Sequence, residues 1–287
     1  MIAITGGSGQ LGQAVAAALS ARVPPSGIRL GTRRPSELQA QVQRGVEVVY
    51  ADFDEPTSLE QLFDRADTAL LICGTASNEV RIRQHQNVIS AAKWAGLSRL
   101  VYTSFVNPVP TSLFPYSEVH ARTEVLLRAS GLHYVLLRNN HYFENLRFAL
   151  GAAYETGMLA LPGAAGKVAY ISRQDLGEAT AAILADTSVK DVELELTGSQ
   201  AVTLYEAAEE ASKVWGRKIQ AYEMPPDEYR LILQARGLPD YAVEAQIGIR
   251  LAAGAGEHAR VTQDAEQLIK RPLKNIQDYL ATFALSF

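Results

Sequence analysis

The sequence predicts an α/β protein with a doubly wound parallel sheet and a smaller, mainly helical C-terminal part. Three observations support this. Short apolar runs alternate with amphipathic helical segments through the first half of the chain, as in βαβ units. A glycine-rich turn joins the first apolar run to the first helical segment. The continuous apolar run at 68–73 is typical of a strand that is covered on both faces.

The elements follow in order along the chain. The apolar runs predict strands at 2–5, 28–32, 46–51, 68–73, 99–104, 133–139 and 192–198. Helical periodicity or capping signals predict helices at 10–20, 36–44, 78–95, 117–130, 142–155, 172–186, 203–216, 226–237 and 275–283, and one that starts at Pro56. A loop and short strand are expected at 163–171.

Local signals set several of these boundaries. Ser36 with Gln39, and Thr57 with Glu60, have the spacing of a capping box at a helix start. Gly96 is placed to end the long helix at 78–95, because glycine adopts the left-handed conformation that closes a helix.

The stretch TGGSGQLG carries the first functional signal. Its glycines Gly6, Gly9 and Gly12 stand at every third position in a strand-to-helix turn. In a Rossmann fold such glycines allow the tight turn, the close approach of a pyrophosphate and close helix packing, and the helix N-terminus favours the phosphates. An unrelated glycine-rich turn is the less favoured alternative. The predicted cofactor contacts here are Gly6, Gly7, Ser8, Gly9, Gln10, Leu11 and Gly12.

The end of the second strand indicates which dinucleotide binds. An NAD site usually carries an Asp or Glu there, but this chain has GTRRP. The guanidinium of Arg33 suits the 2′-phosphate of NADP(H), whereas two solvated surface arginines are the alternative. Further contacts are expected where other strands end, at Asp52, Phe53, Gly74, Ser104 and Asn139. Phe53 would lie against the adenine or belong to the core.

Composition limits the other functions. The 287 residues carry a net charge of −4 and show no basic run, so no nucleic-acid partner is expected. No apolar run is long enough to span a membrane. The single cysteine, Cys73, is either a redox thiol or, as we favour, a small buried apolar residue. The chain opens within its first strand pattern, which leaves no room for a signal peptide, so a cytoplasmic location is expected.

The longer motifs resemble a known family. TGGSGQLG, GTRRP, QHQNVISAAKWAGLSRLVYTS and HARTEVLLRASGLHYVLLRNNHYFEN are similar to the NmrA-like branch of the atypical short-chain dehydrogenases. Within it, the likeness is greatest to NADPH-dependent quinone reductases and triphenylmethane dye reductases. The resemblance implies NADP(H) at the glycine turn and Arg33, with Asn139 to Tyr142 near the nicotinamide. It also implies a substrate pocket between the Rossmann part and the C-terminal helices, without flavin or metal.

The sequence departs from standard short-chain dehydrogenases at the catalytic residues. Those enzymes carry a Tyr and a Lys four residues apart on a helix, with a Ser on the preceding strand. The counterparts here are Tyr116, His120 and Ser104. We therefore expect His120 and Tyr116 as catalytic candidates, His120 being alternatively a partly solvated helix residue. His141 and Arg173 are candidates for contact with the substrate.

Two functions are consistent with these features. The first is an NADPH-dependent reductase that transfers hydride directly to a planar acceptor such as a quinone or a dye. The second is a sensor that binds NADP(H) and acts through a protein partner without turnover, and a sugar-nucleotide epimerase is a distant third. The expected domains are residues 1–140 with 170–198 returning to the sheet, and residues 141–169 with 199–287. A homodimer is possible on this reading.

Overall fold

A computed structural model describes residues 1–284. Contacts between Cα atoms divide the chain into two compact units, each built from separate stretches. The first unit comprises Met1–Phe105, Val119–Asn139 and Arg173–Glu195. The second unit comprises Val106–Glu118, Asn140–Ser172 and the chain from Leu196 onward.

The first unit is built on a seven-stranded sheet with the order β3-β2-β1-β4-β5-β6-β8. Neighbours from β3 to β6 pair in parallel. The predicted fold class is therefore confirmed. The strands are β1 (Ile2–Ile4), β2 (Ile28–Thr32), β3 (Glu47–Tyr50), β4 (Thr68–Leu71), β5 (Arg99–Phe105), β6 (His133–Asn139) and β8 (Val192–Leu196).

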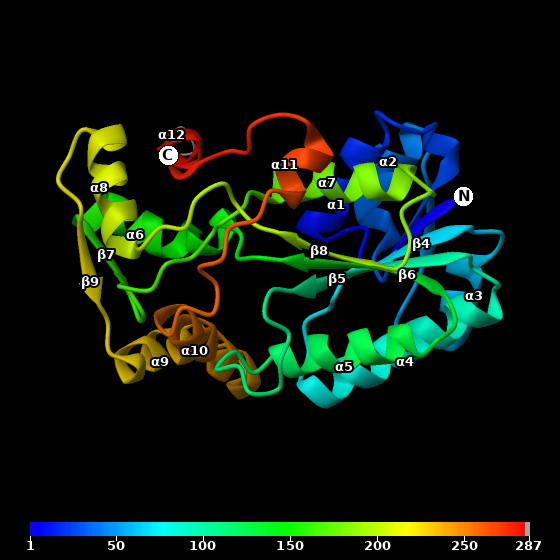
Figure 1. The fold of residues 1–287 in the computed structure, drawn as a ribbon, viewed down its shortest axis with the longest axis horizontal. Helices are drawn as coiled ribbons and strands as arrows, with labels where there is room; N and C mark the ends of the chain where they lie inside the picture. The colour runs from blue at the N-terminus through cyan, green and yellow to red at the C-terminus, as the bar shows by residue number, and fades with distance from the viewer. Residues whose placement is uncertain (285–287) are drawn as a thin grey trace. The chain divides into compact units, whose positions relative to one another are not determined.

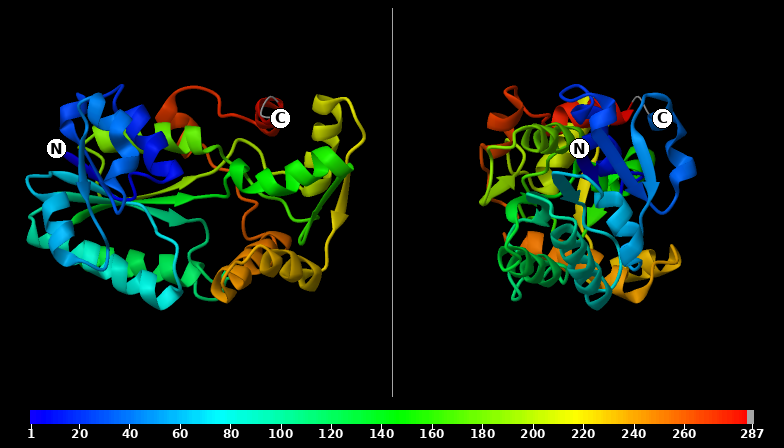
Figure 2. Two further views of the ribbon diagram at one scale, coloured as in Figure 1. Left: turned by 180° about the vertical axis from the view of Figure 1, so that it is seen from behind. Right: turned by 90° about the vertical axis from the view of Figure 1, so that its right-hand side faces the viewer.

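Helices cover both faces of this sheet (Figures 1 and 2). On one face α1 (Gln10–Leu19) packs against α7 (Arg173–Ala185), where a side chain on Gly177 would clash with Ala14. The other face carries α3 (Pro56–Phe63), α4 (Asn78–Trp94) and α5 (Ser117–Arg128). The core beneath these helices is apolar, and it includes Leu62, Phe63, Val88, Tyr102 and Leu127.

Two predicted capping boxes are wrong. Residues 35–38 form a short 3₁₀ helix that leads into α2 (Gln39–Gln43), and neither helix start carries a side-chain cap. The other helix, α3, begins at Pro56 without a side-chain cap. In both cases a proline occupies the first turn, where its fixed φ and missing N–H already suit a helix start.

The second unit is mainly helical but contains a two-stranded parallel sheet that the sequence pattern did not indicate. That sheet pairs β7 (Met158–Leu161) with β9 (Gln220–Glu223). The helices are α6 (Arg147–Thr156), α8 (Leu204–Trp215), α9 (Pro226–Ala235), α10 (Asp240–Gly254), α11 (Asp264–Ile269) and α12 (Ile276–Ala284). Its apolar core includes Leu150, Leu159, Ala207, Ile247 and Leu280.

Two further predictions in the second unit need correction. The helix expected from residue 142 begins at Arg147, because residues 143–146 form a 3₁₀ turn. The strand expected within 163–171 is absent from the described residues, and only isolated bridges occur there, at Val168 and Ile171. Gly163 has a left-handed φ and Gly166 packs directly on the backbone of Ala253, so this stretch is a tight turn.

Residues 106–118 differ from the predicted boundaries, which placed them in the first domain. Glu257 anchors this segment within the second unit by accepting hydrogen bonds from the side chains of Asn107 and Ser112. Pro115 also packs on α10 at Gly248, where a Cβ would come within 2.4 Å of its ring. The loop therefore belongs with the C-terminal stretches that bind it.

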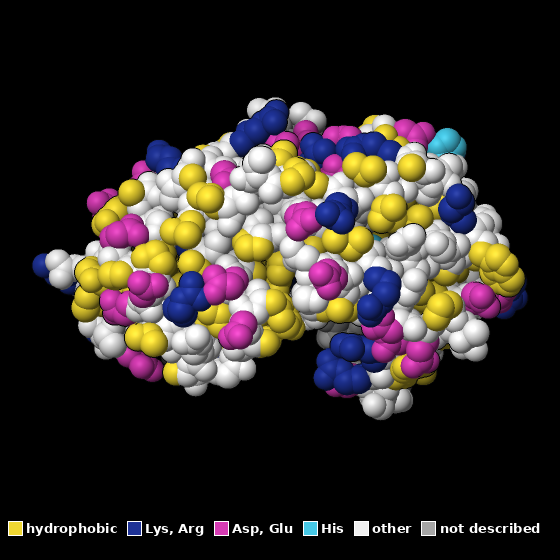
Figure 3. Space-filling view, turned by 90° about the horizontal axis from the view of Figure 1, so that it is seen from below, with side chains coloured by type: hydrophobic (Ala, Val, Ile, Leu, Met, Phe, Trp, Pro, Cys, Tyr) yellow, Lys and Arg dark blue, Asp and Glu magenta, His cyan; other side chains and the backbone are white. Residues whose placement is uncertain are grey.

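The surface carries both charges. On the face seen in Figure 3, basic and acidic side chains are interspersed with hydrophobic ones. Among the described residues, no helix has the length and apolar character needed to cross a membrane.

Candidate functional site

The glycine turn after β1 has the geometry of a close-packed strand-to-helix connection. Gly6 has φ +63°, in the left-handed region that glycine adopts without strain. A Cβ on Gly12 would lie 2.3 Å from the carbonyl oxygen of Gly6. The spacing of these two glycines is therefore required by the backbone itself.

The N-terminus of α1 is open to an anion. Gly9 stands at the N-cap position, and no side chain caps the first turn. The first N–H groups of a helix lack intrahelical partners and carry a partial positive charge. Gln10 is exposed, whereas Leu11 is buried and offers only its backbone N–H. Ser8 shares a hydrogen bond of 2.7 Å with Thr32, which fixes the turn to the end of β2.

Arg33 follows β2 directly and its side chain is exposed. It forms no ion pair with any residue in 1–284, whereas its neighbour Arg34 is paired with Glu37 at 2.8 Å. Of the two arginines, only Arg33 therefore keeps its whole guanidinium for a ligand. This geometry fits a 2′-phosphate.

The next two strand ends form a flat apolar element. Phe53 is half-buried, and the amide of Asn87 holds its carbonyl at 2.9 Å. The ring of Phe53 lies 4.0 Å from the position that a Cβ on Gly74 would take. Asp52 is half-buried, and its carboxylate accepts the N–H of Asp54. Phe53 and Gly74 thus lie side by side, and a planar group bound here would pack against them.

Asn139 ends β6 with a side chain that is only 1% exposed. Neither its amide nitrogen nor its amide oxygen has a hydrogen-bond partner among residues 1–284. Leaving such a buried group unsatisfied costs about 1–3 kcal/mol, and a bound ligand would remove that cost. Asn139 is therefore an orphaned polar group that fits a ligand carrying both a donor and an acceptor.

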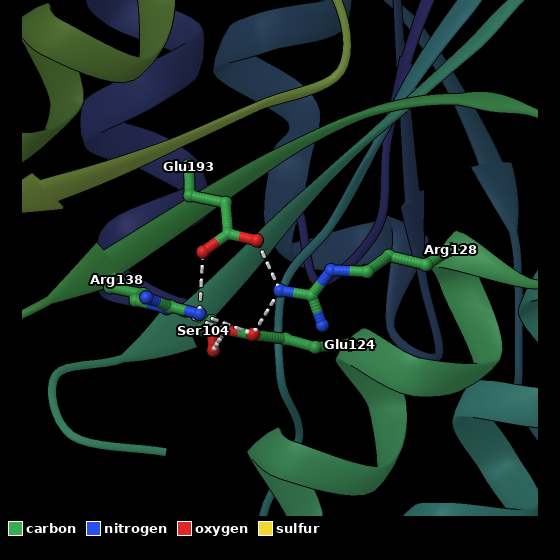
Figure 4. Close-up of polar contacts among 5 residues, drawn as sticks. All are labelled: Ser104, Glu124, Arg128, Arg138 and Glu193. Carbon is green, nitrogen blue, oxygen red and sulfur yellow. Dashed lines mark hydrogen bonds and ion pairs between the residues drawn. The ribbon is translucent and has the colours of Figure 1, made fainter.

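Ser104 on β5 bonds to an ionic cluster in which only the central carboxylate, Glu124, is fully buried (Figure 4). Its hydroxyl donates to Glu124 at 2.7 Å, and Glu124 also accepts from Arg138 at 2.7 Å. Arg128 bonds the same carboxylate at 2.9 Å, and both arginines pair with Glu193 on β8. The Ser104 proton is thus committed to Glu124, and its oxygen retains only the capacity to accept.

Comparison with known proteins places the chain in a family. Residues 1–280 match the NmrA-like family. The chain belongs to the NmrA-like family. It is 33% identical over 280 residues to quinone oxidoreductase 2 of Escherichia coli (strain K12), covering 97% of this chain and 96% of that protein.

Two solved structures resemble this NmrA-like protein over its whole length. The first is the E. coli NADPH-dependent quinone oxidoreductase complexed with NADPH, with a TM-score of 0.93, 31% identity and 99% and 100% of the two chains covered. The other is triphenylmethane reductase of Citrobacter sp. complexed with NADP(H), with a TM-score of 0.92, 30% identity and 98% and 99% covered. The resemblance to these two types of reductase is therefore confirmed.

His120, a predicted catalytic residue of this NmrA-like protein, is buried on α5. Its Nδ1 shares a hydrogen bond of 2.8 Å with the hydroxyl of Tyr102, and its ring stacks on Phe105. Burial, aided by the charges of Arg81 and His85, lowers the pKa of His120 well below its usual range. The ring is consequently neutral near pH 7, and it is not the partly solvated side chain of the alternative reading.

Tyr116 and Tyr142 both lie in the second unit. Tyr116 directly precedes α5, as predicted, and its ring packs on Phe114 at 5.5 Å between centroids. Tyr142 is half-buried and its backbone bridges to Ile171. No contact in the structure tests the predicted role of either tyrosine, so both roles stay predictions.

His141 is buried against His258, a residue that the sequence analysis missed, and its predicted contact with a substrate stays a prediction. Nε2 of His141 and Nδ1 of His258 are 2.8 Å apart. Burial lowers the pKa of His141 well below its usual range and that of His258 to about 4. Both imidazoles are therefore neutral near pH 7, and no local pattern links two residues so distant in sequence.

Arg173 is the first residue of α7 in the first unit, where it is half-buried. Its predicted contact with a substrate stays a prediction. Among residues 1–284 no cluster of three or more His, Cys, Asp or Glu side chains is close enough to hold a metal ion.

Cys73 follows β4 and packs, partly buried, against the apolar core of the first unit, in line with the interpretation favoured from the sequence. The sequence did not reveal that Arg81 donates a hydrogen bond to its sulfur at 2.6 Å. His85, one helical turn beyond Arg81 on α4, is fully buried beside the same thiol. The i, i+4 spacing of Arg81 and His85, which puts both on one helix face, was the available signal.

Proposed function

We propose that this chain is an NADPH-dependent reductase that transfers hydride directly to a planar acceptor such as a quinone or a dye. The observation that carries the proposal is the full-length similarity to two reductases whose solved structures contain NADPH or NADP(H). The residues at the strand ends of the first unit support it, because each offers what one part of the dinucleotide requires.

Each group of residues has a distinct role in binding. The uncapped N-terminus of α1 would hold the pyrophosphate, with the residues from Gly6 to Gly12 allowing its approach. Arg33 would pair with the 2′-phosphate, and Phe53 with Gly74 and Asp52 would flank the adenosine. The orphaned amide of Asn139 would bond the carboxamide of the nicotinamide. When bound, NADPH supplies the hydride.

Of the candidate catalytic residues, neither His120 nor Ser104 is arranged to supply a proton readily. His120 occupies the position of the usual lysine, but it is neutral and bonded to Tyr102. The hydroxyl of Ser104 already donates its hydrogen bond to Glu124. A quinone or cationic dye delocalises the charge of its own product, so orientation matters more than acid catalysis for such acceptors.

The remaining candidates complete the proposal. Tyr142 belongs to the cofactor-binding set, His120 and Tyr116 to the catalytic set, and His141 and Arg173 to the substrate-binding set. His141 shares a hydrogen bond with His258 through Nε2, so we expect its position to depend on that pair.

The decisive experiment measures oxidation of NADPH by the purified protein against a panel of quinones and cationic dyes. We expect steady turnover with at least one acceptor. The Gly9→Val variant is the matched control, since it keeps every other candidate residue while filling the space of the pyrophosphate. NADPH binding without oxidation of any acceptor would instead support the sensor, which is the second candidate because the usual Tyr/Lys pair is missing.

A further inference from the structure

Cys73 lies in a cluster of titratable side chains beneath the sheet that the proposed hydride transfer does not use. The thiol follows β4, Arg81 and His85 belong to α4, and Thr123 belongs to α5. The helices α4 and α5 run side by side on the same face of the sheet (Figures 1 and 2). His85 and Thr123 are both fully buried, whereas Cys73 keeps partial exposure.

The hydrogen bonds around His85 determine its tautomer. The hydroxyl of Thr123 donates its one proton to the carbonyl oxygen of Val119 at 2.8 Å. Toward Nδ1 of His85, 2.7 Å away, that hydroxyl can therefore only accept, so Nδ1 carries a proton. The remaining nitrogen, Nε2, is buried and has no hydrogen-bond partner among the described residues, and His85 is close enough to Cys73 to lower the pKa of the thiol. In the neutral ring Nε2 carries the free lone pair.

The charges that face the thiol favour its ionised form. Burial alone would raise the pKa of Cys73, but the positive charge that His85 gains when it takes up the proton, the charge of Arg81 and the hydrogen bonds of both bring it down to about 6. From β5, Tyr102 stays protonated, because burial and the nearby Cys73 raise its pKa well above the usual value. From α5, His120 is neutral. Arg81 and His85 thus dominate the field at the sulfur.

We propose that Cys73, with His85 as its base and Thr123 as the residue that orients His85, is a nucleophilic site for covalent addition of α,β-unsaturated carbonyl compounds. This arrangement follows the general pattern of an activated nucleophile, in which a third group orients the base. The addition is a different reaction from the proposed hydride transfer and requires no cofactor, although Cys73 adjoins Gly74 of the proposed cofactor site.

The addition balances without an external oxidant or reductant. The S–H proton passes to Nε2 of His85 and leaves a thiolate that Arg81 stabilises through its hydrogen bond. The sulfur forms a bond to the β-carbon of the acceptor as the carbon–carbon π bond breaks and its electron pair moves toward the carbonyl oxygen. The enolate then takes the proton from His85, which gives a thioether and restores the neutral ring.

The test uses the full chain without cofactor and N-ethylmaleimide as the probe. Cys73 is the only cysteine, so every thiol adduct seen by mass spectrometry is at this site. We expect the rate of addition to rise with pH with a midpoint near 6, and Cys73→Ser to form no thioether. A midpoint at about 8.5, the value of an unperturbed thiol, would overturn the proposal.

Two variants separate the base from the surroundings. His85→Gln should move the midpoint above 8 and slow the addition at pH 6 about tenfold. The rate falls less than the fraction of thiolate does, because a more basic thiolate is more nucleophilic. Thr123→Val removes the acceptor for Nδ1 and should move the midpoint in the same direction by a smaller amount. Circular dichroism establishes which variant is folded, and an unchanged midpoint in either folded variant would refute the role of His85.

Discussion

Replacing Arg33 by Ala tests the choice of cofactor. The side chain is exposed and unpaired at the end of β2, so its removal breaks no ion pair among the described residues. A hydrogen bond to a charged group contributes about 1.5–3 kcal/mol, which corresponds to about a tenfold to hundredfold loss of affinity. We expect that loss for NADPH and almost none for NADH, which lacks the 2′-phosphate.

The assay is a titration of both cofactors, with wild-type protein and with Arg34→Ala as the matched control. Arg34 adjoins Arg33 and carries the same charge, but its guanidinium is paired with Glu37. Arg34→Ala should lower the affinity for NADPH less than Arg33→Ala does, because it removes only a nearby positive charge and no direct hydrogen bond to the 2′-phosphate. An equal loss for NADH and NADPH in Arg33→Ala, or a larger loss in Arg34→Ala, would refute the assignment.

Four further outcomes follow from the structure. Gly9→Val should abolish NADPH binding while Gly9→Ala retains some of it, and tight binding by a folded Gly9→Val protein would contradict the proposed phosphate site. Glu124→Ala removes one charged hydrogen-bond partner from Arg128 and Arg138 but leaves both paired with Glu193, so the free energy of unfolding in denaturant should fall by about 1.5–3 kcal/mol, and a fall below 1 kcal/mol would show Glu124 to be dispensable. Because the folded-state pKa of His258 is lowered to about 4, its stabilising effect is present above pH 6.5 and is lost as the pH falls toward 4. Unfolding at pH 5 should therefore cost about 2 kcal/mol less than at pH 7 from this group alone, with no change from pH 7 to 8, and a flat profile would refute this reasoning. Tyr116→Phe should lower kcat less than about tenfold, which is below the 10²–10⁴-fold that acid–base catalysis usually contributes. His120→Ala should lower kcat about tenfold for quinones and little for a cationic dye. A thousandfold loss in Tyr116→Phe would instead restore a conventional tyrosine mechanism.

The local sequence predicted those parts of the molecule whose structure depends on local patterns. The parallel sheet follows from apolar runs, and the turn at Gly6 and Gly12 follows from backbone crowding within one connection. The pair β7 and β9 was missed because its short strands join residues about 60 apart in the sequence, and because β9 is largely exposed and so carries no apolar run.

The site was predicted less completely than the fold for the same physical reason. Arg33 and Asn139 stand at strand ends, which a sequence reveals. The bonds of Ser104 to Glu124, of His141 to His258 and of Cys73 to Arg81 depend on side chains that only the folded chain brings together. Those bonds decide whether a hydroxyl, an imidazole or a thiol is available for a reaction. The sequence therefore predicted where these residues lie in the fold but not how reactive their side chains are.

The division of the chain into interleaved stretches has a consequence for the order of biosynthesis. The first unit uses Met1–Phe105 and Val119–Asn139, but its last strand and Glu193 come only after Asn140–Ser172 has been made. The ribosome adds about 5–20 residues per second, so Glu193 is made several seconds after Arg128 and Arg138. During that time the edge of β6 has no β8 to pair with. The nascent sheet therefore presents an open strand edge during translation, and the ionic cluster of Figure 4 closes that edge when β8 arrives.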